Sequence, residues 1–197
     1  MSISITRQKI LAAASQIVQC KGVAKLTLEA VAKEAGLSKG GLLYHFSNKE
    51  ALIEGMIVRG VEDYEGAIYN KVAEDSERKG RWVRSFVEER LSNERRTEEL
   101  SSSMMAALML KPELLEPLQQ SFQQLQKNIE NDEIDSVCAT IIRLAADGLW
   151  YSEYLGVGRL SPELREKVIH INRIYELYNE KIIHHCFFNV VVNYFFY

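Results

Sequence analysis

Hydrophobic positions recur with helical spacing along most of the chain. Near its start, one helix face is formed by Ile10, Leu11, Ala14, Ile17 and Val18, and Gly22 is placed to end that helix. Only three prolines and eleven glycines interrupt the sequence, and these are the residues that break helices. We therefore expect an all-α protein of about nine helices, with no sheet in its body.

The first 47 residues predict three short helices. Thr27 is placed to cap the second helix and Ser38 the third, and Gly36 permits the positive φ of the turn between them. We expect the small core of this unit to be formed by Leu28, Val31, Ala32, Leu37, Leu42, Leu43 and Phe46. Such a helix-turn-helix presents its last helix outward, so residues 1–47 are predicted to be a DNA-binding domain.

The remainder predicts a larger helical bundle over residues 48–183. A long helix begins near Ser47 and Asn48 and keeps an apolar face past residue 70. A broad apolar stripe predicts another helix from Asp132 to Gly156, and Ser161-Pro162 begins the last one. The uncharged tail 184–197 suits a strand better than a helix; it either docks on the body, docks on a dimer seam, or is an extension foreign to the fold.

Charge is divided unevenly along the chain. Residues 1–49 carry seven basic and two acidic side chains, a net charge of +5, so the other 148 residues carry −8 of the total −3. A basic head on an acidic body suits a protein that presents one end to phosphates, although chance clustering of surface lysines gives the same count. The head therefore remains the candidate for nucleic-acid binding.

The third predicted helix offers few side chains to DNA. Lys39 can reach a phosphate or a guanine edge, and Tyr44 and His45 can contact phosphates or thymine methyl groups. Gly40 and Gly41 allow a close approach, while Thr27 with the amides beside it, and Lys49, can each hold a phosphate. The candidate DNA-binding residues are Thr27, Leu28, Ser38, Lys39, Gly40, Gly41, Tyr44, His45 and Lys49.

The string AGLSKGGLLYHFSNKEAL, within Thr27–Leu52, resembles the signature of the TetR (tetracycline repressor) family. In the body the resemblance is weaker and is carried mainly by Ala146-Asp147-Gly148-Leu149-Trp150. It implies a three-helix DNA-binding head and a helical body that dimerises and holds an effector pocket. It also implies a palindromic operator and repression that an effector relieves.

The resemblance implies that the last two helices pair with those of a second copy. The candidate dimer residues are Ile141, Leu144, Ala145, Gly148, Ile171, Ile174, Tyr175 and Tyr178. A dimer also follows from geometry, because one short recognition helix reads few bases and two half-sites give useful affinity. The alternative is that these stripes only cover the core of a monomer.

Large adaptable side chains of the middle helices are candidates for a pocket that binds a small apolar or aromatic effector. They are Trp82, Phe86, Met104, Met105, Met109, Phe122, Asp147, Trp150, Tyr151 and Tyr154. Each of them can equally be ordinary core. Asp147 stands four residues after Arg143, and a surface ion pair between the two is favoured over a role in orienting a ligand.

The sequence gives no sign of enzymatic chemistry. It lacks the motifs GxxxxGK[ST], GxGxxG, HExxH and GxSxG, and its three cysteines are scattered, so we expect no catalytic site, metal or cofactor. The beginning MSISITRQ does not resemble a secretory signal and no run is long enough to span a membrane, so a cytoplasmic protein is expected. The predicted function is a ligand-responsive DNA-binding regulator; the alternative is a helical dimer that binds small molecules but not DNA.

Overall fold

Every regular element in the described part of the chain is helical. The computed structural model describes the backbone of residues 3–92 and 95–177 and the side chains of residues 5–92 and 99–169. Within them lie nine α-helices and two 3₁₀ turns, which confirms the predicted all-α fold. The elements are α1 (Ile3–Lys21), η1 (Val23–Lys25), α2 (Leu28–Glu34), α3 (Lys39–His45), α4 (Lys49–Glu74), α5 (Arg81–Arg90), α6 (Arg95–Leu110), η2 (Pro112–Leu115), α7 (Glu116–Glu130), α8 (Ser136–Leu155) and α9 (Pro162–Leu177).

The chain packs into two compact units. Among the described residues, the first consists of 3–67 and 95–123, and the second of 68–92 and 124–177. The helices α4 and α7 contribute residues to both. The functional division predicted at residue 47 therefore differs from the division by packing. The first unit joins the predicted head to α6, η2 and the first parts of α4 and α7.

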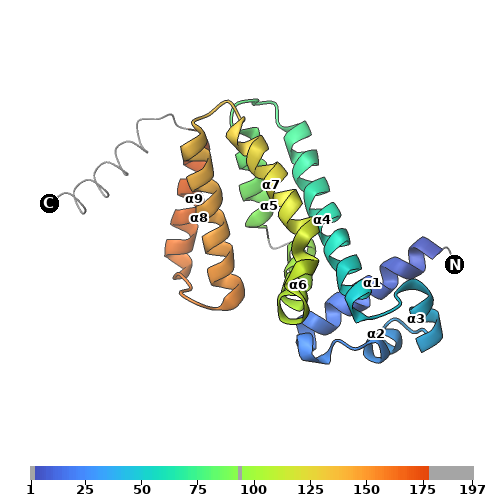
Figure 1. Cartoon of the computed structure of the whole chain (residues 1–197). Coiled ribbons are helices and arrows are strands. Elements are labelled where there is room, and N and C mark those ends of the chain that lie inside the picture. Colours follow the sequence, from blue (N-terminus) through green and yellow to red (C-terminus); the bar gives the residue numbers. More distant parts are fainter. Residues whose placement is uncertain (1–2, 93–94, 178–197) are drawn as a thin grey trace. The chain divides into compact units, whose positions relative to one another are not determined.

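In the head, by which we mean α1 to α3, the short helices α2 and α3 lie beside one end of the chain's first helix, α1 (Figure 1). Ile10, Ala14 and Ile17 of the apolar face of α1 are at most 1% exposed, in agreement with the helical spacing of the sequence. α2 adds Val31 and Ala32, and α3 adds Leu42 and Phe46. Burial of these side chains fixes the short helices α2 and α3, which at seven residues each are too short to be stable alone.

The turn between α2 and α3 has the geometry that the sequence predicts. Gly36 adopts φ +65°, its amide donates to the carbonyl of Lys33, and the amide of Leu37 donates to the carbonyl of Ala32. This pair of bonds is a Schellman motif, which ends α2 sharply and satisfies its last carbonyls. Three residues of the predicted core are not buried. Leu28 and Leu37 are half-buried, and Leu43 is 38% exposed, because it lies one position, about 100°, around the helix from the inward Leu42.

Helix α4 approaches the end of α3 closely at Gly55. A Cβ atom at this position would lie 2.7 Å from Cε1 of Phe46 and 3.1 Å from a guanidinium nitrogen of Arg7. Phe46 is only 3% exposed, so its ring cannot simply turn out into solvent. Gly66, further along the same helix, has nothing within 4 Å of such a Cβ.

These two glycines give a matched pair of substitutions. Gly55→Ala is expected to destabilise the protein by about 1–3 kcal/mol, because overpacking against Phe46 outweighs the better helix propensity of alanine. Gly66→Ala gains only the propensity and is expected to stabilise by roughly 0.5–1 kcal/mol. Urea unfolding followed by circular dichroism measures both, and equal stabilities for the two variants would contradict the close packing at Gly55.

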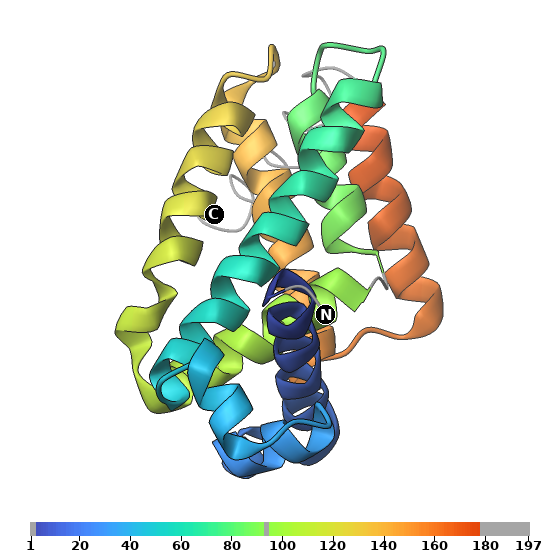
Figure 2. The ribbon, with the colours of Figure 1, turned by 90° about the vertical axis from the view of Figure 1, so that its right-hand side faces the viewer.

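The second unit is formed mainly by α5, α8 and α9, of which α8 and α9 run antiparallel as neighbours (Figures 1 and 2). α5 buries Val83, Phe86 and Val87, none more than 1% exposed, and α8 faces it with Ala139, Ile142, Ala146 and Leu149. Gly156 ends α8 in the left-handed conformation, as its place in the sequence predicts.

Asp132 corrects the predicted start of α8. The helix begins at Ser136 with Asp135 as its N-cap, whereas Asp132 lies before it and is 2% exposed. Its two carboxylate oxygens accept the amides of Trp82 and Val83 at 3.0 and 2.9 Å, so it caps the start of α5 from a distant part of the chain. Burial raises the pKa of this carboxyl, and the two amide donors act in the opposite direction.

Candidate DNA interface

Two side-chain caps orient the helix-turn-helix. Oγ1 of Thr27 accepts the amide of Ala30 at 3.1 Å, and Oγ of Ser38 accepts the amide of Gly41 at 3.0 Å. Both caps are those that the sequence predicts, and each fixes the direction in which its helix starts. A Cβ on Gly41 would lie 3.3 Å from Oγ of Ser38, so the absence of a side chain there protects the cap of α3.

The surface of α3 is open where DNA contacts are expected. Tyr44 is 74% exposed and the Lys39 side chain 58% exposed, and a Cβ on Gly40 would have nothing within 4 Å. The rings of Tyr44 and His45 meet edge to face at 5.3 Å, which holds the half-buried His45 beside the exposed phenol. Thr27 and Ser38 are also exposed, whereas Leu28 and Lys49 are half-buried.

Lys49 lies at the first position of α4. Oδ1 of Asn48 accepts the amide of Ala51 at 2.7 Å, so Asn48 rather than Ser47 is the residue that caps this helix. A lysine in the first turn is opposed by the positive end of the helix dipole and is therefore not placed there for helix stability. Its position after α3 is consistent with the predicted contact to a phosphate.

Arg7 is a further residue of the head that the sequence did not indicate. Its guanidinium carbon lies 5.1 Å from the centre of the Phe46 ring, an arrangement in which a cation stacks on an aromatic face. Arg7 comes from α1 and Phe46 ends α3, so the contact ties the reading helix to the first helix. Nothing in the local sequence links residues 39 apart, which is why only the fold reveals this pair.

The two acids of the head are both engaged in ion pairs. Oε1 of Glu29, in the first turn of α2, lies 2.5 Å from Nζ of Lys39 at the start of α3. Oε2 of Glu34, at the other end of α2, lies 3.2 Å from Nζ of Lys21. A hydrogen bond from Lys39 is the main reason that the pKa of Glu29 is lowered. One predicted DNA contact, Lys39, is thus held by a carboxylate in the free protein.

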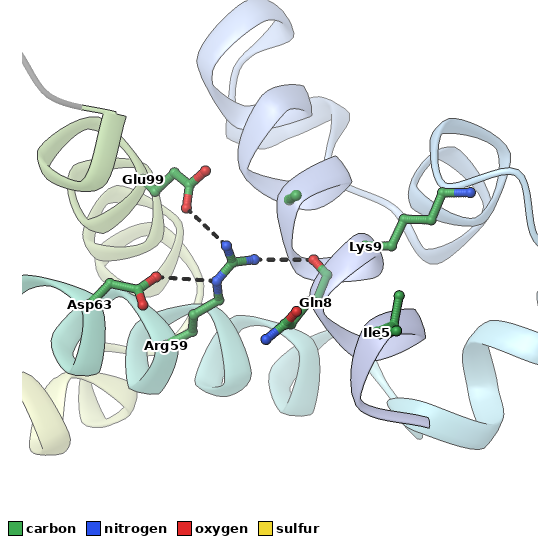
Figure 3. Close-up of a pocket in the computed structure, with 7 residues that line it drawn as sticks. Ile5, Gln8, Lys9, Arg59, Asp63 and Glu99 are labelled. Atoms are coloured by element: carbon green, nitrogen blue, oxygen red, sulfur yellow. Dashed lines mark hydrogen bonds and ion pairs between the residues drawn. The ribbon is translucent and has the colours of Figure 1, made fainter. Parts of the chain in front are cut away.

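A pocket of 440 Å³ in the first unit is bounded by α1, α4 and α6 (Figure 3). On one side of it, the Arg59 guanidinium donates to the backbone carbonyl of Gln8 at 3.1 Å and pairs with Asp63 at 3.3 Å and Glu99 at 3.7 Å (Figure 3). Arg59 therefore connects the helix of the head that carries Gln8 with α4 and α6. None of the ten predicted pocket residues lines this pocket.

In the second unit, four of the predicted effector residues gather around a buried arginine. Nε of Arg90, which is 1% exposed, lies 2.8 Å from Oδ1 of Asp147, and its guanidinium carbon stacks 4.0 Å from the Trp150 ring centre. Trp150 in turn stacks on Tyr154 at 5.0 Å and meets Tyr151 edge to face at 4.9 Å. Arg90 was missed, although it continues the inward spacing of Val83, Phe86 and Val87.

The surface pair predicted for Arg143 and Asp147 is wrong. Nη1 of Arg143 does lie 2.8 Å from Oδ2 of Asp147, but the two side chains are only 18% and 12% exposed, and Asp147 also pairs with Arg90. Burial raises the pKa of Asp147, whereas the charges of Arg90 and Arg143 act to lower it. Packing against α5 is what turns an ordinary helical pair into a buried network.

The remaining predicted pocket residues are dispersed. In the second unit Trp82 is half-buried and meets Tyr69 edge to face at 5.1 Å, while Phe86 is fully buried core. In the first unit Met104 and Met105 are half-buried, Phe122 stacks on Tyr64 at 6.3 Å, and Met109 is 66% exposed. A single pocket that contains all ten residues therefore remains a prediction.

The predicted dimer residues of α8 share one outer face. Leu144 is 53% exposed, Ala145 and Gly148 are exposed, and Ile141 is half-buried. Exposed Val137, Tyr151 and Leu155 extend the same face along the helix. Ile171, Ile174 and Tyr175 belong to α9, but their side chains lie outside the described residues, as do Tyr178 and the whole tail 184–197.

The described residues offer neither a metal-binding cluster nor a membrane-spanning helix. They contain no group of three or more His, Cys, Asp or Glu side chains placed to hold a metal ion. None of the described helices combines the length and the apolar character that crossing a membrane requires.

Two family models match this chain in its two halves. Residues 10–56 match the model described as bacterial regulatory proteins of the tetR family. Residues 80–171 match the model of the tetracyclin repressor-like C-terminal domain. The first range contains all of α2 and α3, and the second contains α5 to α8.

Similar proteins include the HTH-type transcriptional regulator TtgR of Pseudomonas putida, 36% identical over 52 residues, or 26% of this chain and 25% of that protein. The chain thus spans about a quarter of the length of this curated relative.

Among solved structures, a regulator from Saccharomonospora viridis in complex with choline is 19% identical (87% of this chain, 94% of that chain, TM-score 0.69). The multidrug binding protein EbrR complexed with ethidium is 21% identical (86% and 98%, TM-score 0.60). These two likenesses show the fold.

Proposed function

The chain belongs to the TetR family of bacterial regulators, and we propose that it binds a DNA operator as a homodimer and regulates transcription there. The observation that carries this proposal is the geometry of α3. Its N-terminal cap at Ser38, its open glycine surface and its exposed Lys39 and Tyr44 together form a helix that can enter the major groove. Lys49 and Thr27 lie at positions where they can hold the phosphates on either side.

The outer face of α8 supports a dimer. A row of exposed apolar residues on one helix is costly in water and is typical of a surface that a second copy covers. Ala145 and Gly148 lie on this face and are small enough for two helices to approach closely. With two heads held at a fixed spacing, the preferred operator is an inverted repeat.

Leu144→Glu is expected to convert the dimer into a monomer. Two glutamates would face each other in the apolar seam, with a cost of about 2 kcal/mol or more per side, which for the two sides is roughly a 1,000-fold or greater rise in the dimer dissociation constant. Sedimentation equilibrium measures this constant. Leu108→Glu is the control, because Leu108 is 50% exposed but lies on α6. A dimer that tolerates Leu144→Glu as well as Leu108→Glu would contradict the proposed seam.

We propose that a small apolar or aromatic effector releases the operator. The relatives bound to ethidium and choline suggest an aromatic site, and the rings of Trp150, Tyr151 and Tyr154 are candidates for it here. Effector binding would displace α4, whose first turn follows the reading helix, and lower the affinity for DNA. The proposed location is the cytoplasm, where the operator is found.

Selection of duplexes from a randomised pool by the purified protein tests the proposed function. We expect enrichment of an inverted repeat with half-sites about one helical turn apart, and an affinity whose logarithm falls linearly with the logarithm of salt concentration. A metabolite screen on the selected duplex then tests release. No enrichment, with no binding even in low salt, would instead favour a helical dimer that binds small molecules alone.

A further inference from the structure

Glu29 stands out because it places a negative charge beside the expected phosphate contacts of the head. Residues 1–49 contain two acids, and only Glu29 lies at the starts of α2 and α3, next to Thr27 and Lys39. A bare carboxylate at this position would repel DNA from either strand. If the head binds DNA, the presence of Glu29 at this position therefore needs an explanation.

The partner of Glu29 is the one long side chain in the first turn of α3. Gly40 and Gly41 follow Lys39 and offer none, so the ammonium of Lys39 is the main polar group that this turn can extend toward DNA. Glu29 fixes that ammonium against α2 at 2.5 Å, with both side chains more than half exposed. The lowered pKa of Glu29 agrees with a pair that is formed in the free head.

We propose that Glu29 is a positioning residue that sharpens sequence discrimination by acting through Lys39, an inference that rests on the proposed DNA-binding function. On a non-operator duplex the pair approaches as a neutral unit, so Lys39 adds nothing to the counterion release that drives non-specific binding. On the operator, Lys39 turns to the acceptor edge of a guanine, and Glu29 accepts a hydrogen bond from an exocyclic amine, cytosine N4 or adenine N6. An exposed ion pair is weak enough for this exchange to occur.

The test compares two duplexes of equal length, the one selected by wild-type protein and a scrambled version of it. Glu29→Gln frees Lys39 to neutralise one phosphate per head, worth about fivefold in affinity at about 0.15 M salt. Binding of the scrambled duplex by the dimer should therefore tighten by roughly 25-fold, and its salt slope should steepen by about 2. The selected duplex should change by less than about threefold, so that discrimination falls by roughly tenfold or more.

Glu34→Gln is the matched control, since it makes the same change of charge on the same helix but releases Lys21. It should affect both duplexes equally and leave discrimination unchanged. Glu29→Gln is also made in a Lys39→Gln background, where its effect on the scrambled duplex should largely disappear. Circular dichroism checks that all variants stay folded, as their exposed positions lead us to expect.

Two results would overturn the role of Glu29 while leaving the proposed function intact. One is an equal effect of Glu29→Gln on both duplexes, and the other is an undiminished effect when Lys39 is absent, because Glu29 would then act as a bare charge. A wild-type protein that binds neither the pool nor the scrambled duplex at low salt would instead overturn the proposed function, and this inference with it.

Discussion

Replacing Lys39, Tyr44 and Lys49 together with alanine should reduce operator affinity by several hundred-fold or more. The two copies of Lys49 supply two phosphate contacts per dimer, each worth about fivefold through counterion release at about 0.15 M salt. The two copies of Lys39 lose contacts to guanine edges, each worth about 1–3 kcal/mol. The salt slope should become shallower by about 2, because only the Lys49 contacts release counterions. Tyr44, 74% exposed beside His45, adds a hydrogen bond or ring contact that alanine cannot replace.

The triple variant should remain folded and dimeric, because none of the three side chains is buried. Fluorescence anisotropy with the selected duplex measures the loss, and sedimentation equilibrium with circular dichroism checks assembly and helix content. A second triple variant, in which Lys21, Lys25 and Lys33 are changed to alanine, serves for comparison. It removes three positive charges from the same head, one more than the first variant. If the variant at Lys39, Tyr44 and Lys49 bound the duplex as tightly as the wild-type protein, another surface of the head would have to contact DNA.

Asp147→Ala should destabilise the second unit by about 3–5 kcal/mol. Asp147 lies 2.8 Å from both Arg90 and Arg143, and its removal leaves two cations in a site where Arg90 is 1% exposed. A buried charge without its counterion costs far more than an intact pair contributes. Stacking of Arg90 on Trp150 does not replace the lost carboxylate, because a cation over an aromatic ring gains only about 1–2 kcal/mol.

Urea unfolding followed by tryptophan fluorescence is well suited to this measurement, since both tryptophans, Trp82 and Trp150, belong to the second unit. Glu88→Ala is the control: it breaks a pair with Lys71 whose side chains are 50% and 31% exposed, and should cost less than about 1 kcal/mol. The combined apolar replacement R90M/R143M/D147L should recover much of the loss. The expectation would be contradicted if Asp147→Ala destabilised the protein no more than Glu88→Ala and the triple replacement recovered no stability. The buried arginines would then not depend on the carboxylate of Asp147.

The helix-turn-helix could be read from the sequence because its signals are local. Caps at Thr27 and Ser38, the left-handed Gly36 and the spacing of Ile10, Ala14 and Ile17 each depend on residues within a few positions of one another. Backbone hydrogen bonding and helical periodicity act over the same short range. Of the predicted core of the head, Val31, Ala32, Leu42 and Phe46 are buried, Leu28 and Leu37 are only half-buried, and Leu43 is exposed, because the choice between adjacent positions depends on what packs against α3.

The paired charges could not be read in the same way. Glu29 with Lys39, Arg59 with Glu99, and Arg90 with Asp147 each join residues of different helices, separated by 10 to 57 positions. A charged side chain looks the same in a sequence whether it is solvated or buried, and its environment is decided by the helix packed against it. This is why the pair of Arg143 and Asp147 was assigned to the surface.

By itself, the sequence determined the helices, the turn that presents α3, and the basic surface beside it, because propensity, capping and net charge are properties of neighbouring residues. Only the tertiary structure decided which carboxylate holds Lys39, how closely Gly55 lets α4 approach Phe46, and that Arg90 lies against Trp150 and Asp147. These features depend on distances between helices, which short-range signals in the chain do not specify.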